Sequence, residues 1–192
     1  MASAASIKWL LLVPLILGGW LSREAPHHAP PSRAAPVVRM LAHSPVVTEY
    51  RRAARRVTAR HLAGPYAHAA LRAARKNHLP PLLVAAVIHQ ENRGFLENCA
   101  ERVSPAGAIG PMQLMPATAW NLLHVNPWNP KANIAGGAKY LRYLVTEFHS
   151  VSRALVAYNA GPTQVAAGVY PEQAVYYARA VMRNAGITPY RA

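Results

Sequence analysis

Residues 80–91 read PPLLVAAVIHQE, and this stretch predicts a helix buried inside a folded domain. The two prolines suit the first turn of a helix, where a backbone N–H would have no partner. Residues 82–88 are apolar on every face, which is typical of a helix surrounded by core. Glu91 shares a face with Val84 and Ile88 at the i, i+4, i+7 spacing, so a carboxyl group ends an apolar stripe.

Glu91 stands at the C-terminal end of this predicted helix. Burial raises the pKa of a carboxyl group, and the negative end of the helix dipole raises it further. A carboxylic acid that stays protonated near neutral pH can act as a general acid. The alternative is that the helix frays at residues 92–94 and Glu91 reaches solvent, and this segment alone does not separate the two.

The chain around this helix predicts an all-α domain with at most a minor hairpin. From residue 66 onward, apolar residues recur at helical spacing, and no alternating run rich in β-branched residues predicts a strand. The longest helix is expected at residues 131–148, where one stripe contains Ile134, Ala138, Leu141, Val145 and Phe148. Further helices are expected at residues 66–76, 117–123, 151–158, 162–167 and 172–185.

The N-terminal part of the chain has a different composition. Residues 9–21 read WLLLVPLILGGWL, which is short for a membrane-spanning helix of about 20 residues but fits the apolar region of a signal peptide. We expect residues 1–21 to be a signal peptide or a retained signal anchor, although a buried helix of the domain is the alternative. Residues 22–64 predict a proline-rich linker and a basic helix, followed by a catalytic domain at 65–186 and a tail at 187–192.

Positive charge is concentrated upstream of the domain. The chain has 21 Lys and Arg against 7 acidic residues, a net charge of +14, and the helix expected at residues 48–62 contains the run RRAARR. We expect this basic arm to be attracted to an anionic membrane or wall polymer. A solvated linker helix is the alternative, and nucleic acid is disfavoured because the export segment removes the chain from most nucleic acid.

Composition excludes several kinds of site. All acidic residues are Glu, and without Asp the chain cannot form an EF-hand loop, a kinase metal site or an aspartic-protease dyad. The single cysteine, Cys99, excludes an intramolecular disulfide and a CxxC motif, and we expect it to be a packed or free thiol. His27 and His28 fall in the linker, so we expect neither a metal nor a cofactor.

Two further segments could line a sugar site. In residues 104–120, Gly110 lets the backbone approach a ligand, Gln113 offers a donor and an acceptor, and Met112 is an adaptable apolar wall. In residues 157–162, Tyr158 and Asn159 place a phenol and an amide just before a glycine and a proline that end the predicted helix. Each segment alone is also compatible with an ordinary loop.

Taken in order, these motifs resemble the catalytic domain of the soluble-lytic-transglycosylase family, which has a goose-type-lysozyme-like fold. The resemblance covers residues 65–186 and rests on AAVIHQE at 85–91, SPAGAIGPMQLMPATA at 104–119, GAKYL at 137–141, AYNAGP at 157–162 and the Glu and Tyr residues of 172–177. The family cleaves the β-1,4 bond between N-acetylmuramic acid and N-acetylglucosamine in peptidoglycan and forms a 1,6-anhydro product.

The resemblance implies a role for particular residues. Glu91 takes the place of the family's catalytic acid and base, and the absence of Asp fits a mechanism with one carboxyl group. The substrate-binding residues it implies are Gln113, Met112, Tyr158, Asn159 and Tyr176.

The chain departs from the family pattern at two places. Asn92 follows the acid where the family usually has Ser, and the segment 93–103 is a few residues longer. We expect Glu97 and Glu101 in this segment to be solvated.

The function expected from the sequence is an exported peptidoglycan lytic transglycosylase in the periplasm or cell envelope. A lysozyme-type hydrolase on the same fold and a non-catalytic peptidoglycan-binding module are the alternatives. The small size and basic exported arm also resemble wall-opening enzymes of envelope-spanning secretion or conjugation machines.

Overall fold

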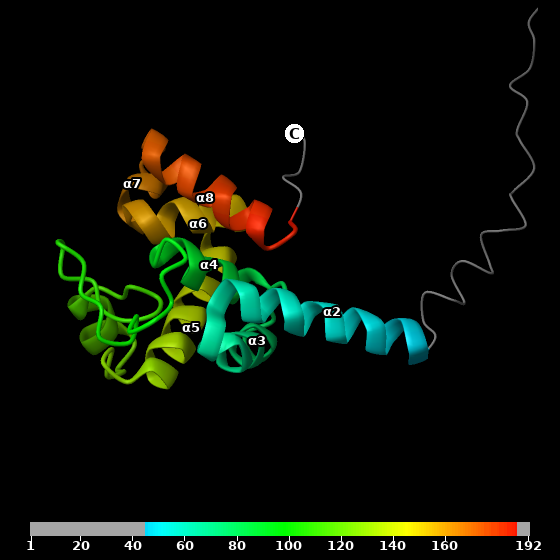
Figure 1. The fold of residues 1–192 in the computed structure, drawn as a ribbon. Coiled ribbons are helices and arrows are strands. Elements are labelled where there is room, and N and C mark those ends of the chain that lie inside the picture. Colours follow the sequence, from blue (N-terminus) through cyan, green and yellow to red (C-terminus); the bar gives the residue numbers. More distant parts are fainter. Residues whose placement is uncertain (1–44, 188–192) are drawn as a thin grey trace, which may run out of the picture. The chain divides into compact units, whose positions relative to one another are not determined.

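A computed structural model describes residues 45–187, so the expected export segment, most of the linker and the end of the tail lie outside the described residues. The described chain is helical and contains no strand (Figure 1). Its elements in order are α2 (Pro45–Ala63), the 3₁₀ turn η1 (Gly64–Tyr66), α3 (Ala67–Lys76), α4 (Leu83–Glu91), the π-helical turn η2 (Thr118–Leu122), α5 (Pro130–Phe148), α6 (Val151–Ala160), α7 (Pro162–Ala166) and α8 (Glu172–Asn184).

Helix α4 lies at the centre of the domain, as the sequence predicts. Every residue from Leu83 to Ile88 is fully buried, and α2, α3 and α8 pack against the helix. An all-apolar surface of this kind gains about 25 cal/mol for each Å² removed from water, so a central position is the favourable one. Glu91 is therefore held at the end of a helix that its neighbours fix on several sides.

Helix α5 has the apolar stripe expected for the longest helix. Ile134, Ala138 and Leu141 are buried, together with Leu144 on the same face. The helix begins where the Asn129 side chain accepts hydrogen bonds from the backbone N–H groups of residues 131 and 132, each at 3.0 Å, with a proline in the first turn. The predicted packing of this helix is confirmed.

Helices α6 and α8 bring distant parts of the chain beside α4. Helix α6 packs against both α5 and α8, and α8 also packs against α4 (Figure 1). Gly161, at φ 95°, ends α6, and Pro162 starts the next helix at once. This arrangement places the Tyr158–Asn159 pair and the start of α8 close to the C-terminal end of α4.

The segment between α4 and α5 is mostly irregular and is fastened by a buried asparagine. Its two isolated antiparallel bridges join Val103 to Ile109 and Ile109 to Leu114. The fully buried Asn133 side chain accepts from the Met112 N–H at 2.9 Å and donates to two carbonyl oxygens, those of residues 109 and 127. A β-carbon at Gly110 would lie 2.6 Å from this amide, so glycine is required there.

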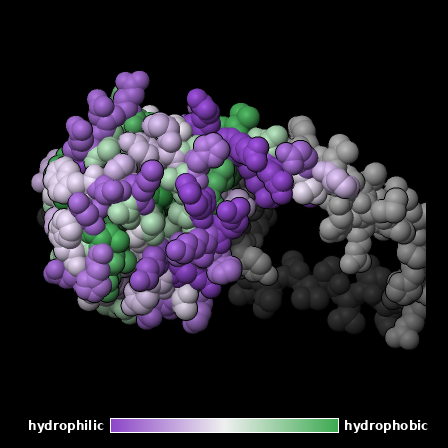
Figure 2. All heavy atoms as spheres, turned by 90° about the horizontal axis from the view of Figure 1, so that it is seen from below, coloured by the Kyte–Doolittle hydropathy of each residue, from purple (hydrophilic) through white to green (hydrophobic). Residues whose placement is uncertain are grey.

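The last turn of α2 belongs to the same core as the helices that follow it. Ala59, Leu62 and Ala63 are buried in one cluster with α3 and α4, whereas residues 51–58 are all exposed. The surface over α2 and the adjoining part of the domain is largely hydrophilic (Figure 2). Within residues 45–187, no helix has the length and apolar character needed to cross a membrane.

Candidate active site

Glu91 forms the centre of the candidate site. The Tyr177 hydroxyl, on α8, donates a 2.6 Å hydrogen bond to Oε1 of Glu91, across 86 residues of chain. Tyr177 is only 7% exposed, which fixes the position of its ring. Glu91 as a whole residue is partly exposed, and its neighbours Gln90 and Tyr177 line the pocket beside it.

The surroundings of Glu91 raise the pKa of its carboxyl group from 4.5 to about 7. Loss of solvation on burial is the largest cause, and the Tyr177 hydrogen bond and the positive charge of Arg102 lower the pKa by smaller amounts. This is the direction that the sequence predicts for a carboxyl group at the end of a buried helix. At neutral pH both the acid and the carboxylate are well populated, which suits a group that must donate one proton and accept another.

Asn92 fastens the end of α4 to the loop that faces it. The side chain is fully buried, and Nδ2 donates 2.8 Å hydrogen bonds to the carbonyl oxygens of both Ile88 and Pro111. Arg102 donates to the Asn92 carbonyl oxygen at 3.1 Å. Within residues 45–187, Oδ1 of Asn92 has no hydrogen-bond partner. Asn92, which stands where the family usually has Ser, therefore links the end of α4 to the loop at Pro111 through its side-chain amide.

The loop at residues 110–113 is held in a strained conformation beside the acid. Gln113 has a φ of 47°, and its side-chain amide donates to the Gly110 carbonyl oxygen at 2.9 Å and to that of Arg102 at 3.3 Å. Met112 is fully buried, and a β-carbon at Gly137 would lie 2.6 Å from its sulfur. Met112 thus packs in the core, so its side chain does not form the apolar wall of the sugar site that the sequence predicts.

Tyr158 joins α6 to this loop. Its hydroxyl donates to the Met112 carbonyl oxygen at 2.9 Å, and its ring centroid lies 5.7 Å from that of Tyr140. Burial raises the pKa of Tyr158 well above 10, and the nearby charges of Glu91 and Tyr140 raise it further. The phenol therefore stays protonated and acts as a donor.

The two tyrosines at the start of α8 have different environments. Tyr176 is 59% exposed and lines a pocket of about 600 Å³ together with Asn159, Gln90 and Tyr177. Tyr177 contacts Glu91, and the sequence analysis did not select it. The signal was present: Tyr177 falls at i+3 from the buried Ala174 and at i−4 from the buried Val181, whereas Tyr176 lies off this stripe.

The longer segment 93–103 contributes Arg102 to the site. Glu97 and Glu101 are exposed, as expected, and Cys99 is a buried free thiol. Arg102 was also missed by the sequence analysis, because nothing local to it indicates that it lies near residue 91. The described residues contain no group of three or more His, Cys or Glu side chains that could hold a metal ion.

The described residues thus place one carboxyl group, with a raised pKa and a tyrosine donor, at the end of a buried helix. The family described as "Transglycosylase SLT domain" matches residues 68–176, which is more than half of the chain. The chain therefore belongs to this family, whose solved members in these comparisons share its helical, lysozyme-like fold.

Individual relatives extend the comparison. A protein of Enterobacteria phage PRD1 described as "Transglycosylase" is 37% identical over 118 residues, covering 58% of this chain and 43% of that protein. The lytic transglycosylase Slt of Pseudomonas aeruginosa, solved as an inactive Glu-to-Gln mutant, is 26% identical with a TM-score of 0.53, over 63% of this chain and 24% of that one. The chain thus spans less than half the length of either relative.

A third similarity is to an enzyme solved with a ligand. The complex of the 70-kDa soluble lytic transglycosylase with bulgecin A has a TM-score of 0.54 at 24% identity, over 62% of this chain and 23% of that one. At this level of identity the likeness concerns the fold.

Proposed function

We propose that this protein is a lytic transglycosylase that cleaves the β-1,4 bond between N-acetylmuramic acid and N-acetylglucosamine in peptidoglycan. The observation that carries the proposal is the Glu91 carboxyl group, which is hydrogen-bonded to Tyr177 and has a pKa of about 7. Membership of the transglycosylase family and the inactive Glu-to-Gln mutant of a relative support the assignment.

In the first half of the reaction, protonated Glu91 donates its proton to the oxygen that links the two sugars. The bond between this oxygen and C1 of N-acetylmuramic acid breaks, the N-acetylglucosamine end leaves as an alcohol, and positive charge develops at C1. Glu91 is left as a carboxylate. The Tyr177 hydroxyl then donates a charge-assisted hydrogen bond to it, which is stronger than its bond to the neutral acid.

In the second half, the Glu91 carboxylate accepts the proton of the 6-hydroxyl group of the same N-acetylmuramic acid. The oxygen of that hydroxyl attacks C1, closes the 1,6-anhydro ring and returns the acid to its starting form. No water is consumed, so one carboxyl group suffices. Gln113, Tyr158, Asn159 and Tyr176 serve to shape the site and to orient the sugars.

The products distinguish this reaction from hydrolysis on the same fold. Purified wall digested by the full chain and analysed by mass spectrometry should give fragments with 1,6-anhydro ends. Reducing ends, heavier by one water molecule, would identify a lysozyme-type hydrolase. Binding to wall without release of fragments would identify a binding module and overturn the catalytic proposal.

We place the protein in the periplasm or cell envelope, because its proposed substrate lies outside the cytoplasmic membrane. The apolar stretch at residues 9–21 supports export. The small size and basic arm fit a wall-opening role within an envelope-spanning secretion or conjugation machine. Cell fractionation, with the N-terminus of the mature chain sequenced, tests both export and cleavage; a chain found only in the cytoplasm would contradict this placement.

A further inference from the structure

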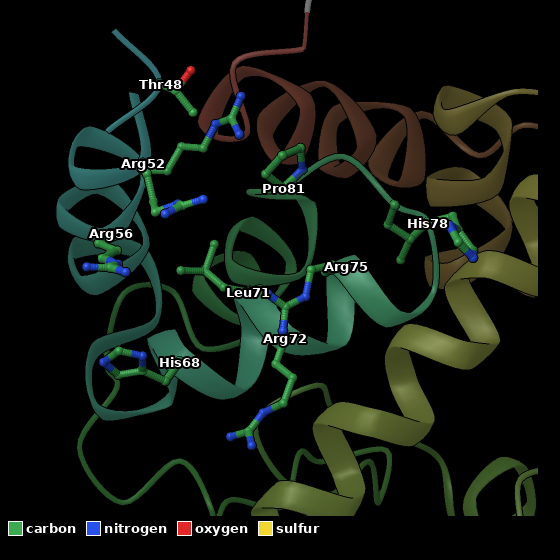
Figure 3. Close-up of a pocket in the computed structure, with 11 residues that line it drawn as sticks. Thr48, Arg52, Arg56, His68, Leu71, Arg72, Arg75, His78 and Pro81 are labelled. Atoms are coloured by element: carbon green, nitrogen blue, oxygen red, sulfur yellow. The ribbon is translucent and has the colours of Figure 1, made fainter. Parts of the chain in front are cut away.

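Helices α2 and α3 enclose an open groove of about 1080 Å³ whose walls are basic. Arg52, Arg55 and Arg56 lie on one face of α2, at the i, i+3, i+4 spacing. On α3, His68, Arg72 and Arg75 occupy one face at i, i+4, i+7, and His78 follows the helix (Figure 3). We call these residues, with Thr48, Leu71, Leu79 and Pro81, the basic groove.

The arginines of the basic groove are poorly neutralised within the described chain. Arg52 forms a 3.3 Å ion pair with Glu49, and both side chains are more than half exposed. Among residues 45–187, no carboxylate lies within ion-pair distance of Arg55, Arg72 or Arg75. Like charges gathered in this way repel one another, so a bound anion would relieve the repulsion.

The composition of the basic groove indicates which anion fits. All of its permanent cations are arginines, whose planar guanidinium groups bind phosphate oxygens in pairs. No phenylalanine, tyrosine or tryptophan lines it, although single-stranded nucleic acid is usually bound by stacking bases on such rings. Leu71, Leu79 and Pro81 instead place apolar surface between the cations, which suits an amphiphile with a phosphate headgroup.

The position of the basic groove in the chain points to a membrane. Thr48, on its wall, is separated from the apolar stretch 9–21 by fewer than thirty residues. Stable attachment to a bilayer generally needs two weak signals, such as an apolar insertion and a basic patch. The groove is also distant in the fold from the acid, because Pro81 precedes α4 and Glu91 ends it.

We infer that the basic groove binds the phosphate groups of anionic phospholipids and holds the domain at a membrane surface while the acid stays free. The inference goes beyond the proposed activity and does not depend on it. It differs from a general attraction of the basic helix, because two of the five arginines come from α3.

Vesicle binding by the full chain tests the inference. Binding is measured to phosphatidylcholine vesicles with and without phosphatidylglycerol, for the wild type, Arg72→Gln/Arg75→Gln, and a control, Lys131→Gln/Arg153→Gln. Both variants lose two positive charges from exposed positions, and the control positions lie on α5 and α6 outside the groove. Binding to pure phosphatidylcholine measures the contribution of the apolar stretch and should be the same for all three.

At about fivefold per arginine, the groove variant should bind phosphatidylglycerol vesicles about 25-fold more weakly, whereas the control should change by about twofold or less. Arg52→Gln/Arg55→Gln, on α2, should weaken vesicle binding in the same way. This second variant excludes the explanation that the α3 substitutions only disturb the local structure of α3. All variants should digest soluble glycan fragments at the wild-type rate. Equal losses in groove and control variants would overturn the inference.

Two competitors identify what the groove recognises. Glycerol phosphate should release the wild type from vesicles more effectively than chloride at the same ionic strength. If it releases no more than chloride does, the groove does not recognise phosphate and the inference is wrong. Tighter, groove-dependent binding to a single-stranded oligonucleotide than to the vesicles would replace the lipid with nucleic acid and would also overturn it.

Discussion

Glu91 is one ionisable group enclosed by helices, whereas the basic groove gathers five arginines on an open surface. Around Glu91, loss of solvation is the main cause that raises the pKa to about 7, and a single tyrosine donates a hydrogen bond to the carboxyl group. In the groove each charge stays exposed, interacts weakly and is screened over about 8 Å at physiological ionic strength. Burial thus changes the pKa of one carboxyl group, whereas the exposed arginines can attract an anion only by acting together.

Glu91→Gln is expected to have the largest effect. The amide keeps the shape of the protonated acid but cannot transfer a proton, and general acid–base assistance is worth about 10²–10⁴-fold. Release of fragments from wall should fall by at least that factor. Glu97→Gln and Glu101→Gln change exposed loop residues and should retain near-wild-type rates. If one of these is the inactive variant, the assignment of the acid is wrong.

The same substitution should change how stability depends on pH. Because the pKa of Glu91 is about 7 in the folded chain and near 4.5 when unfolded, the folded state binds this proton more tightly. Wild-type stability should therefore fall as pH rises from about 4.5 to 7, by about 3 kcal/mol.

Thermal unfolding across this pH range measures the effect. The stability difference between Glu91→Gln and the wild type should increase up to about pH 7 and then level off. The same profile for Glu101→Gln should follow the wild type. A difference that is constant with pH would contradict the raised pKa.

Asn92→Ala tests the link between α4 and the loop at residues 110–113. It removes the bond to the Pro111 carbonyl oxygen and leaves that buried group without its partner, which should cost about 1–3 kcal/mol in the free energy of unfolding. Asn77→Ala, which loses a bond within one helix end, is the matched control and should cost less. Denaturant unfolding compares the two, and equal costs would show that the link adds nothing.

Tyr177→Phe separates the two neighbouring tyrosines. The Tyr177 hydrogen bond favours the carboxylate, so its loss should raise the pKa of Glu91, move the high-pH limb of the rate profile upward and reduce kcat by about tenfold. Tyr176→Phe should leave that limb unmoved, because its hydroxyl has no hydrogen bond to Glu91 among the described contacts. Identical pH profiles for both variants would remove Tyr177 from the acid's surroundings.

Features that depend on local periodicity could be predicted from the sequence. The burial of α4, the stripe of α5 and the raised pKa of Glu91 all follow from which residues share a helix face. The same periodicity applies to Tyr177, because it shares a helix face with the buried residues of α8. That pattern predicts that Tyr177, and not Tyr176, faces the core.

Features that depend on tertiary contacts between segments far apart in the sequence could not be predicted. Asn92 bonds to a carbonyl group 19 residues away, and Arg102 approaches the acid through an irregular loop with no periodic signal. The positive charge of residues 48–62 was evident, but the packing of α2 on α3 decides that Arg72 and Arg75 share a groove with it. Tertiary packing supplies this information.

The proposed mechanism requires the fold to hold Glu91 half-protonated at neutral pH, so that it can both donate and accept a proton. Direct titration of the glutamate carboxyl carbons by ¹³C NMR, with Glu91→Gln used to assign the signal, tests it most directly. We expect a single Glu91 midpoint at about 7. A Glu91 midpoint near the ordinary value of 4.5 would show that the fold does not hold the carboxyl group protonated.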